Sequence, residues 1–340
     1  MKYEEIFTYH NLYRAHMKVR KNRLWKKEVM EFELNKAYEI NKLFDELRKK
    51  TYKISPYRTF KIYEPKERRV DATSYRDRVV QNCFVDNYLF PLLEKRLIYD
   101  NAACRIGKGT DFARLRLKRF MLKESKRGDN VYVLTYDIHH YFESIDHNVL
   151  KNKLKKLIDD DEIFAFVSMI IDSFNKEENK GLPLGNQTSQ AFALYYLDKF
   201  DRIIKEKYSI HSYTRYMDDG VIVSSDKAKL RILLSSLEKE LDDIKLSFNS
   251  KRTRIYPLKE GITYLGFTYR IVGSNKIVTK MAKGKRKRLI SYLDRYAHSY
   301  ESLLSYRNYL KMRCSENGLI KRIDKEMNFL SIAENICDCD

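Results

Sequence analysis

The spacing of apolar residues divides the chain into helical and extended stretches that do not alternate regularly. Helical spacing of apolar side chains predicts helices in residues 3–50, 77–97 (with an interruption at Pro91), 188–207, 227–245 and 285–312. Shorter apolar or alternating runs predict strands in residues 57–63, 68–73, 131–138, 253–256 and 262–272, and a strand–turn–strand in 209–224. This irregular mixture favours an α+β architecture over a doubly wound parallel sheet.

Acidic residues stand at two places where predicted strands stop. Asp137 ends the apolar run 131–136, and Asp218 and Asp219 lie in the tight turn of 209–224. Adjacent aspartates in a turn are often only solvated turn formers. If Asp137 lies on a neighbouring strand, however, three carboxylates converge, and their repulsion calls for divalent cations such as Mg²⁺. Two such ions clamp the attacking and leaving oxygens of an in-line phosphoryl displacement.

The composition narrows the class of protein. The 340 residues are 43% hydrophobic and 34% charged, which excludes a wholly disordered chain, and 11 Gly with 5 Pro exclude collagen-like and low-complexity classes. The formal net charge of +20 favours a polyanionic partner. Nucleic acid is the first interpretation, an anionic membrane surface the second, and a merely soluble basic surface the alternative.

Cysteine usage and hydropathy indicate an ordinary reducing environment. The five cysteines form no CxxC pair, so neither a zinc ribbon nor a disulfide framework is predicted. Cys337 and Cys339 lie in a terminus that we interpret as frayed. The first ten residues contain no apolar leader and no run of about 18 apolar residues occurs, so we expect a cytoplasmic location without membrane contact.

Four motifs, in order along the chain, resemble those of reverse transcriptases. Residues 216–219 (YMDD) resemble the YxDD signature, and 133–146 (VLTYDIHHYFESID) resemble the acidic motif that precedes it. Residues 181–190 (GLPLGNQTSQ) resemble the motif between these two, and 264–267 (YLGF) resemble the primer-grip segment. The resemblance implies an RNA-directed DNA polymerase with the right-hand fold: fingers, a palm of antiparallel sheet plus helices, and a short helical thumb.

The resemblance also divides the chain. It implies N-terminal helices and fingers in residues 1–130, a palm in 131–268 with an inserted fingers segment at about 151–180, and a thumb in 269–340. No ribonuclease H, endonuclease or maturase extension is expected within that last segment.

The resemblance assigns roles to individual residues. It implies that Asp137, Asp218, Asp219 and the backbone of Ile138 hold two Mg²⁺ ions, with Mn²⁺ as a substitute, and that Phe142 excludes a 2′-hydroxyl. The expected dNTP-binding residues are Arg69, Arg78, Phe142, Leu184, Gly185 and Gln190. The expected nucleic-acid-binding residues are Arg105, Lys108, Tyr216, Met217, Leu265, Gly266, Lys283, Lys285, Arg286, Lys287 and Arg288. Lys66 and Arg76 are alternates for the triphosphate, and Lys251 or Arg252 is expected near the leaving pyrophosphate.

Neighbours of the acidic motif are interpreted as structural. Asp146 is expected to be a helix cap or a surface acid, and Tyr141 to be a packing residue. His139, His140 and His147 have no zinc-site spacing, and adjacent histidines do not easily face one ion, so we interpret them as structural or substrate-facing.

One departure from the family pattern indicates a lineage. The common form QGxxxSP is LGxxxSQ here, from Leu184 to Gln190, which resembles the variant of diversity-generating retroelement reverse transcriptases. That lineage implies a bacterial or phage enzyme that makes adenine-mutagenic cDNA from a template-repeat RNA. It also implies a small, basic, oligomeric accessory variability protein, together with the template RNA, the cDNA/RNA duplex and dNTPs as partners. Another bacterial reverse transcriptase (phage-defence or retron-like) and a non-catalytic RNA-binding palm scaffold stay open as alternatives.

Overall fold

The computed structural model describes residues 1–340 except 64–66, 129, 175–178, 274–275, 297–298 and 338–340, and it leaves out the side chains of 296 and 329–337. The strands are β1 (Arg58–Ile62), β2 (Arg68–Ala72), β3 (Tyr132–Tyr136), β4 (Tyr213–Tyr216), β5 (Asp219–Ser224), β6 (Arg254–Pro257), β7 (Ile262–Tyr264), β8 (Phe267–Val272) and β9 (Lys276–Met281). The helices up to the third strand are α1 (Tyr3–Ile6), α2 (Tyr9–Val19), α3 (Lys27–Leu34), α4 (Lys36–Arg48), α5 (Tyr75–Phe84), α6 (Phe90–Glu94) and α7 (Thr110–Ser125). The later helices are α8 (Tyr141–Ser144), α9 (His147–Lys155), α10 (Asp161–Asp172), α11 (Gln187–Tyr196), α12 (Asp198–Arg202), α13 (Lys227–Asp243), α14 (Lys283–Tyr296), α15 (Tyr300–Arg313) and α16 (Asn317–Cys337).

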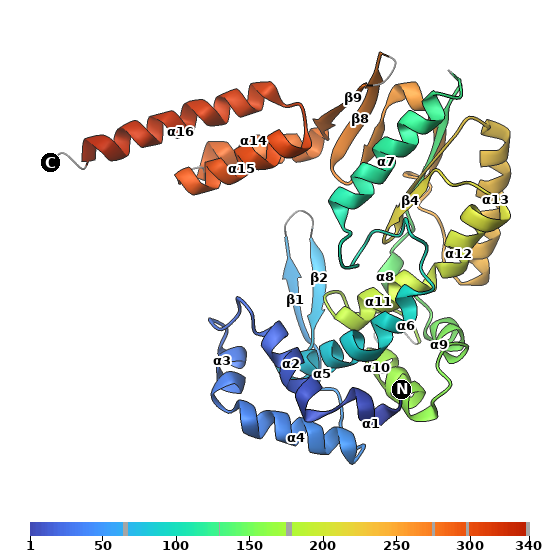
Figure 1. Cartoon of the computed structure of the whole chain (residues 1–340), viewed down its shortest axis with the longest axis vertical. Helices are drawn as coiled ribbons and strands as arrows, with labels where there is room; N and C mark the ends of the chain where they lie inside the picture. Colours follow the sequence, from blue (N-terminus) through green and yellow to red (C-terminus); the bar gives the residue numbers. More distant parts are fainter. Residues whose placement is uncertain (64–66, 129, 175–178, 274–275, 297–298, 338–340) are drawn as a thin grey trace.

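A four-stranded antiparallel sheet in the order β4-β5-β3-β6 forms the middle of the molecule (Figure 1). Successive side chains of a strand point to opposite faces, and β3 is buried on both. Leu134 and Tyr136 join the large core beneath the N-terminal and central helices, whereas Val133 joins a second core with α7 and the β7–β8 strands. Coverage of both faces explains why residues 131–136 are apolar almost throughout.

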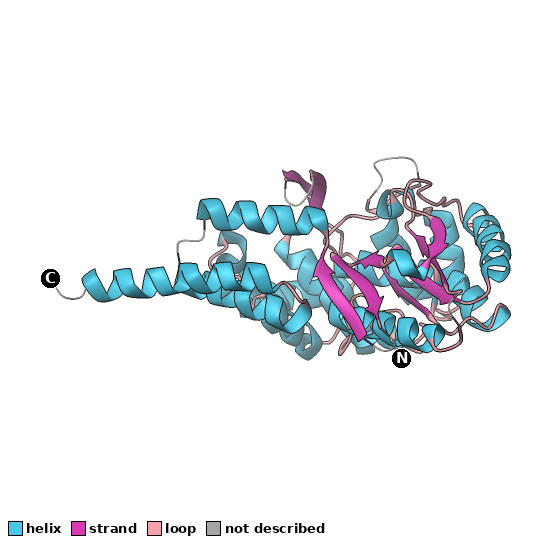
Figure 2. Ribbon diagram, turned by 90° about the horizontal axis from the view of Figure 1, so that it is seen from above, coloured by secondary structure: helices cyan, strands magenta, loops and turns pink. Residues whose placement is uncertain are grey.

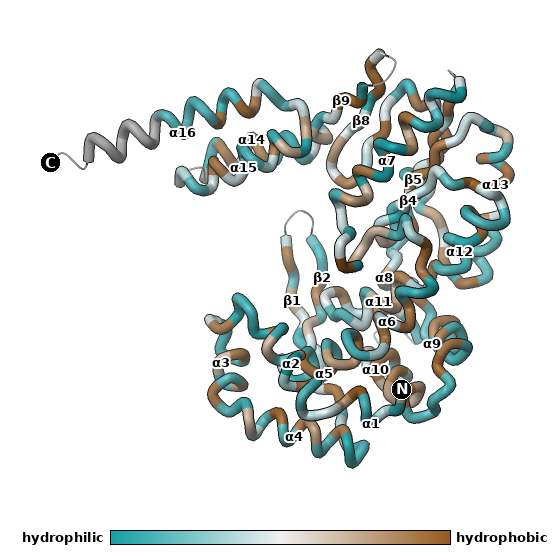
Figure 3. Tube along the Cα trace, viewed as in Figure 1, coloured by the Kyte–Doolittle hydropathy of each residue, from teal (hydrophilic) through white to brown (hydrophobic). Residues whose placement is uncertain are grey.

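Helices α1 to α5 pack with α10 into one layer. Phe166 of α10 meets the rings of Tyr3, Phe7 and Phe84, which come from α1, the turn after it, and α5. The β1–β2 hairpin rises from this layer toward α14 and α15 (Figure 1). All five residues of β1 are exposed, and Figure 3 shows that β2 is hydrophilic toward the tip of the hairpin.

The C-terminal part adds a further sheet and a helical core, and β7 and β8 share a core with β3 and β5 of the four-stranded sheet. Strands β7, β8 and β9 form an antiparallel three-stranded sheet, and α14, α15 and α16 share a small core of their own. In Figure 2, α16 extends far beyond the rest of the chain.

Most predicted elements are confirmed, and four boundaries were wrong. The predicted strand 262–272 is the β7–β8 hairpin, which turns at Leu265 and Gly266. The predicted helix 285–312 is two helices, α14 and α15, and the predicted helix 188–207 is divided at Leu197. The interruption expected at Pro91 is a π-helical turn at Val85–Leu89, directly before α6. Strand β9, helices α7 to α10 and helix α16 lie outside the predicted ranges.

Two expected absences concern membranes and disulfides. Among the described residues, no helix is both long and apolar enough to cross a bilayer. Cys83, Cys104 and Cys314 are free thiols, whereas the Cys337 side chain and Cys339 lie outside the described residues.

We predict that Leu134→Ala lowers the free energy of unfolding by about 2–5 kcal/mol, because it opens a cavity between the sheet and the helices. Leu134 is 0% exposed in the central strand. The measurement is urea unfolding followed by circular dichroism. The matched control is Ile232→Ala on α13, where the side chain is 61% exposed, and a similar loss in both variants would contradict the prediction.

Candidate active site

The strand register brings the three carboxylate-bearing residues to one place. Tyr136 of β3 pairs with Gly220 of β5, so Asp137, the next residue, comes opposite Asp219. Tyr216 pairs with Asp219 across the β4–β5 hairpin, which leaves Met217 and Asp218 as the turn. The condition set by the sequence, that Asp137 lies on a strand beside the hairpin, is therefore met.

Burial and mutual repulsion disfavour the charged forms of the hairpin carboxylates. Burial first, and then the charges of Asp218 and Asp137, raise the pKa of Asp219 to about 7, against the opposing effect of Arg252. Burial and Asp137 also raise the pKa of Asp218. A site of this kind gains from any cation that enters it, because each added positive charge offsets the cost of ionising these groups.

Asp137 already has a cationic partner. Its Oδ1 atom accepts a hydrogen bond of 2.6 Å from Nη1 of Arg252, and its Oδ2 accepts one of 3.1 Å from Nδ2 of Asn249. The backbone N–H of Asn249 also donates to the Asp137 carbonyl over 2.8 Å, so the loop after α13 fixes the end of β3. The sequence predicted Lys251 or Arg252 near the leaving pyrophosphate, but it gave no sign that Arg252 pairs with Asp137.

The oxygen atoms at this place are of the type that a hard divalent cation binds. Asp137, Asp218 and Asp219 supply carboxylate oxygens, and Ile138 supplies a backbone carbonyl, which are the ligands that Mg²⁺ prefers. Among the described residues, however, no three His, Cys, Asp or Glu side chains already converge as a metal cluster. The arrangement is therefore a set of neighbouring acids with Arg252 among them rather than a closed cage.

A glycine next to the acids is required by close packing. A Cβ atom at Gly220 would lie 2.2 Å from Cζ of Tyr136, the fully buried ring that precedes Asp137. The Tyr136 ring therefore lies across Gly220, in the space that a side chain at position 220 would occupy.

A basic cavity of about 360 Å³ gathers several of the residues expected to bind dNTPs. Arg78, Gly185 and Gln190 line it, together with Lys18, Lys21 and Arg23 from the end of α2 and the loop that follows. The last three residues were missed in the sequence. The available signal was the dense basic run in residues 18–27, which includes the exposed Trp25.

The other expected dNTP-binding residues do not line this cavity, and they differ in exposure and in their partners. Arg69 projects from β2 with a 59% exposed side chain and lies 3.7 Å from Asp71. Leu184 is half-buried directly before Gly185. Phe142 is half-buried against the main core, and its carbonyl accepts from the N–H of Leu182. Arg76, an alternate, pairs with Glu46, and Lys66 lies outside the described residues.

Two residues expected to contact nucleic acid are engaged within the protein instead. Arg105 is 9% exposed, makes a bidentate pair with Glu94, and donates to the carbonyls of Ile98 and Asn101. Lys108 donates to the Tyr99 carbonyl over 2.6 Å, and burial lowers its pKa to about 8. Both side chains shape the loop rather than face an open surface.

The remaining nucleic-acid candidates fall into two groups. Tyr216 and Met217 are half-buried and pack beside Leu194. Leu265 and Gly266 form the β7–β8 turn, which is held by Arg114 through the Leu265 carbonyl and by Ala282 through the Gly266 carbonyl.

The basic start of α14 is only partly available to a ligand. Lys285 donates to the Tyr309 hydroxyl, Arg286 pairs with Glu316 at 3.4 Å, and Arg288 donates to the Gly284 carbonyl. Lys283 and Lys287 are exposed to solvent. Arg286 and Arg288 are exposed as well, so four of the five expected cations of α14 face outward and Lys285 alone among them is half-buried.

The interpretation of the structural neighbours is confirmed for three residues. Asp146 caps α9 by accepting from the N–H of Val149, and it also pairs with Lys245. Tyr141 is buried and donates to the Ala193 carbonyl, and the buried His147 ring contacts the Gly181 carbonyl at 2.7 Å.

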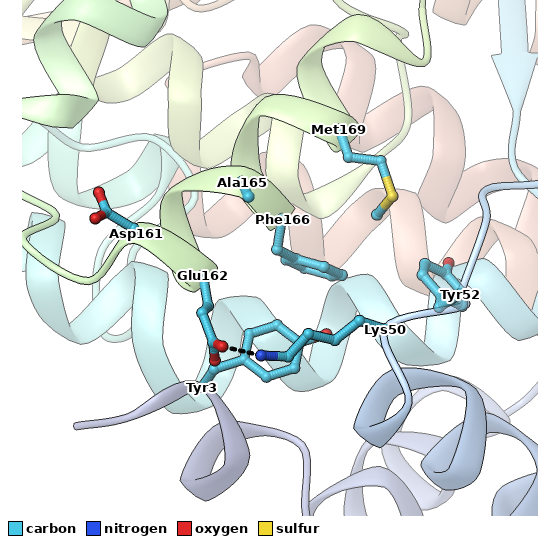
Figure 4. A pocket seen from close by; sticks show the side chains of 8 residues that line it. All are labelled: Tyr3, Lys50, Tyr52, Asp161, Glu162, Ala165, Phe166 and Met169. Atoms are coloured by element: carbon cyan, nitrogen blue, oxygen red, sulfur yellow. Dashed lines mark hydrogen bonds and ion pairs between the residues drawn. The ribbon is translucent and has the colours of Figure 1, made fainter.

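An apolar cavity of about 350 Å³ lies elsewhere, between α1 and α10. Figure 4 shows Tyr3, Phe166 and Met169 around it, with the Lys50–Glu162 ion pair at one side. None of the three acidic residues of the sheet lines this cavity, so it plays no part in the site.

The comparisons with known proteins agree with this geometry. Residues 47–269, more than half of the chain, match the family model described as "Reverse transcriptase (RNA-dependent DNA polymerase)". The chain therefore belongs to the reverse transcriptase family. No curated protein sequence matches it.

Solved structures show the same fold at low identity. The chain is similar to apo telomerase from Candida tropicalis truncated from its C-terminal domain, at 13% identity and a TM-score of 0.50, over 70% of this chain and 59% of that one. It is also similar to telomerase from Candida albicans in complex with a fragment of telomeric RNA, at 12% identity and a TM-score of 0.53, over 76% and 51%. The chain thus spans between half and three-fifths of these proteins, and the likeness concerns the polymerase fold alone.

We predict that Gly220→Ala lowers the free energy of unfolding by about 1–3 kcal/mol, because Tyr136 must leave its place to admit the methyl group. Thermal unfolding measures the effect. Gly284→Ala on α14 is the control, since its Cβ would meet no atom within 4 Å. Equal stability of the two variants would show that the packing at Gly220 is looser than described.

Proposed function

We propose that this chain is the mutagenic reverse transcriptase of a diversity-generating retroelement, which copies a template-repeat RNA into cDNA with errors concentrated opposite adenine. The observation that supports this proposal is Leu184 beside the basic cavity, where the common family form has glutamine. Leucine has no amide with which to hold the incoming nucleotide. Weaker positioning reduces the penalty for a mispair.

Asp137, Asp218 and Asp219 are proposed as the catalytic residues, with the Ile138 carbonyl as a further ligand. Reverse transcriptases generally use divalent metals. Two Mg²⁺ ions, or Mn²⁺ in their place, would activate the primer 3′-hydroxyl and offset the charge of the leaving pyrophosphate. The raised pKa values of the hairpin carboxylates support this role, because a divalent cation restores their charged forms.

The proposed subdomains follow the packing with one adjustment. Contacts of Phe166 with the N-terminal helices support the assignment of the segment near 151–180 to the fingers. Strand β8 crosses the expected palm–thumb boundary at residue 268, and Met281 shares a core with α14 to α16. We therefore propose that the thumb begins near Met281, after the three-stranded sheet.

Proposed partners follow from the family and the charge. The net charge of +20, the cations Lys18, Lys21, Arg23 and Arg78, and the exposed Lys283 and Lys287 support binding of template RNA, the cDNA/RNA duplex and dNTPs. An oligomeric accessory variability protein and a bacterial or phage cytoplasm complete the proposal. The target gene, the template RNA and the priming site are to be identified by experiment.

We predict that Asp218→Asn lowers primer extension on an RNA template by roughly 1,000-fold or more, because the developing negative charge loses its metal site. The assay contains dNTPs and Mg²⁺, and excess EDTA is expected to abolish activity in the unmodified protein. Asp243→Asn, an exposed carboxylate on α13, is the matched control and keeps full activity. Undiminished extension by Asp218→Asn would refute the catalytic assignment.

We predict that Leu184→Gln reduces errors opposite template adenine, relative to errors opposite the other bases, by about tenfold. A tenfold change is about 1.4 kcal/mol, the order of one hydrogen bond to the incoming nucleotide. Sequencing of the cDNA measures the ratio, and Leu184→Met, which adds no amide, serves as control. Accurate copying by the unmodified protein would favour another reverse transcriptase lineage.

A further inference from the structure

We infer that Arg215 and Asp201, a buried ion pair behind the YMDD turn, are positioning residues that fix the turn in the arrangement needed for nucleotide transfer. This inference rests on the proposed catalytic role of Asp218 and Asp219. The side chains of both residues are 0% exposed. Arg215 lies in β4, and Asp201 lies in α12.

The guanidinium of Arg215 connects three elements at once. Its Nε and Nη2 atoms bind the two Asp201 oxygens at 2.8 and 2.6 Å, a bidentate pair. Its Nη1 donates to the Met217 carbonyl at 2.7 Å, and Nη2 also donates to the Leu194 carbonyl at 3.1 Å. Arg215 therefore holds the turn directly against the end of α11 and against α12.

A hydrogen bond to the Met217 carbonyl can fix the orientation of Asp218. Met217 takes a left-handed φ of 56°, which is unfavourable for a residue with a side chain unless its surroundings hold it there. Its carbonyl belongs to the peptide bond that leads into Asp218. A hydrogen bond to that oxygen fixes the plane of this peptide, and with it the direction in which Asp218 leaves the turn.

The same network reaches the strand that carries Asp137. The Tyr213 hydroxyl donates to Oδ1 of Asp201 over 2.6 Å, and it lies 2.6 Å from the hydroxyl of Tyr136. Tyr136 directly precedes Asp137, and its ring is the one that excludes a side chain at Gly220. One hydrogen-bonded chain thus connects Tyr136, next to Asp137, with Met217, next to Asp218.

The backbone of Arg215 is held on the other side as well. Its N–H donates to the Asp100 carbonyl at 3.2 Å, and its carbonyl accepts from the N–H of Ala102 at 2.9 Å. The residue therefore has little freedom to move away from the turn.

Stability alone is a weak explanation for this ion pair. A buried ion pair is often replaceable by apolar residues of similar size without loss of stability, because desolvation offsets the attraction. What apolar residues do not reproduce is a directed bond to the Met217 carbonyl. The pair is therefore expected to matter for the geometry of the turn more than for the fold.

The test compares Arg215→Met, Arg215→Lys, Asp201→Asn and the double variant Asp201→Leu/Arg215→Met. Primer extension gives kcat and the KM for dNTP, and thermal unfolding gives stability. Hydrogen exchange measured on peptides that cover Met217 to Asp219 reports the turn without reference to activity. Leu230→Ala, at a fully buried core residue of α13, is the control for loss of stability.

We expect the double variant to fold and to lose about 100-fold in kcat, the usual cost of a small misplacement of reacting groups, with little change in KM. Exchange of the turn amides is expected to rise about tenfold relative to the rest of β3 and β5, which corresponds to a local rather than a global opening. Arg215→Lys keeps the charge but loses the fork, so it is expected to rescue stability and not kcat. Leu230→Ala is expected to lose stability and keep kcat.

The inference would be overturned by a folded double variant with unchanged kcat, or by one with unchanged exchange at the turn. Loss of kcat in Leu230→Ala equal to that in Arg215→Met would also overturn it, because stability would then explain both. A complete lack of extension by the unmodified protein with accessory factors present would instead refute the proposed function. The exchange experiment would still decide whether Arg215 holds the turn.

Discussion

The burial of two carboxylates, Asp218 and Asp219, beside a third, Asp137, is the constraint on which the arrangement of this protein depends. Antiparallel pairing of β3 with β5 brings Asp137 opposite Asp219, and the two-residue turn adds Asp218 beside them. Like charges at this distance, partly removed from water, oppose the fold that assembles them. The surrounding structure must therefore supply rigidity and positive charge, and both are found next to the turn.

Rigidity comes from polar groups that are themselves buried. Tyr136, Tyr213, Asp201 and Arg215 form a continuous hydrogen-bonded chain behind the sheet edge, and Gly220 leaves room for the Tyr136 ring. Positive charge comes from Arg252, the one cation that binds Asp137 in the described part of the chain. The site therefore has one rigid, buried side, formed by these polar groups, and an opposite side that carries Arg252. The Arg252 side chain is 58% exposed, so another cation can take its place.

How far the sequence predicts such a site depends on the range of the interactions. The apolar run of β3, the acid at its end and the hairpin with two aspartates are local signals, and they were sufficient to predict the elements. The break of the helix at Leu197 was not predictable from periodicity, because apolar spacing continues across it. The two ion pairs of the site were not predictable from periodicity either. Neither Arg215 with Asp201 nor Arg252 with Asp137 leaves a periodic pattern in the sequence.

The positions of the basic residues in the structure show that the net charge of the chain does not tell which cations are available to a ligand. The excess of cations indicated a polyanionic ligand. Arg105, however, pairs with Glu94 and donates to carbonyls of its own loop. Lys18, Lys21 and Arg23, which no motif singled out, line the cavity with Arg78 because α2 packs against α5. Desolvation explains this division: a guanidinium is fully buried only where a carboxylate and several carbonyls surround it, as around Arg105, whereas Lys18 keeps a 56% exposed side chain although it pairs with Asp86.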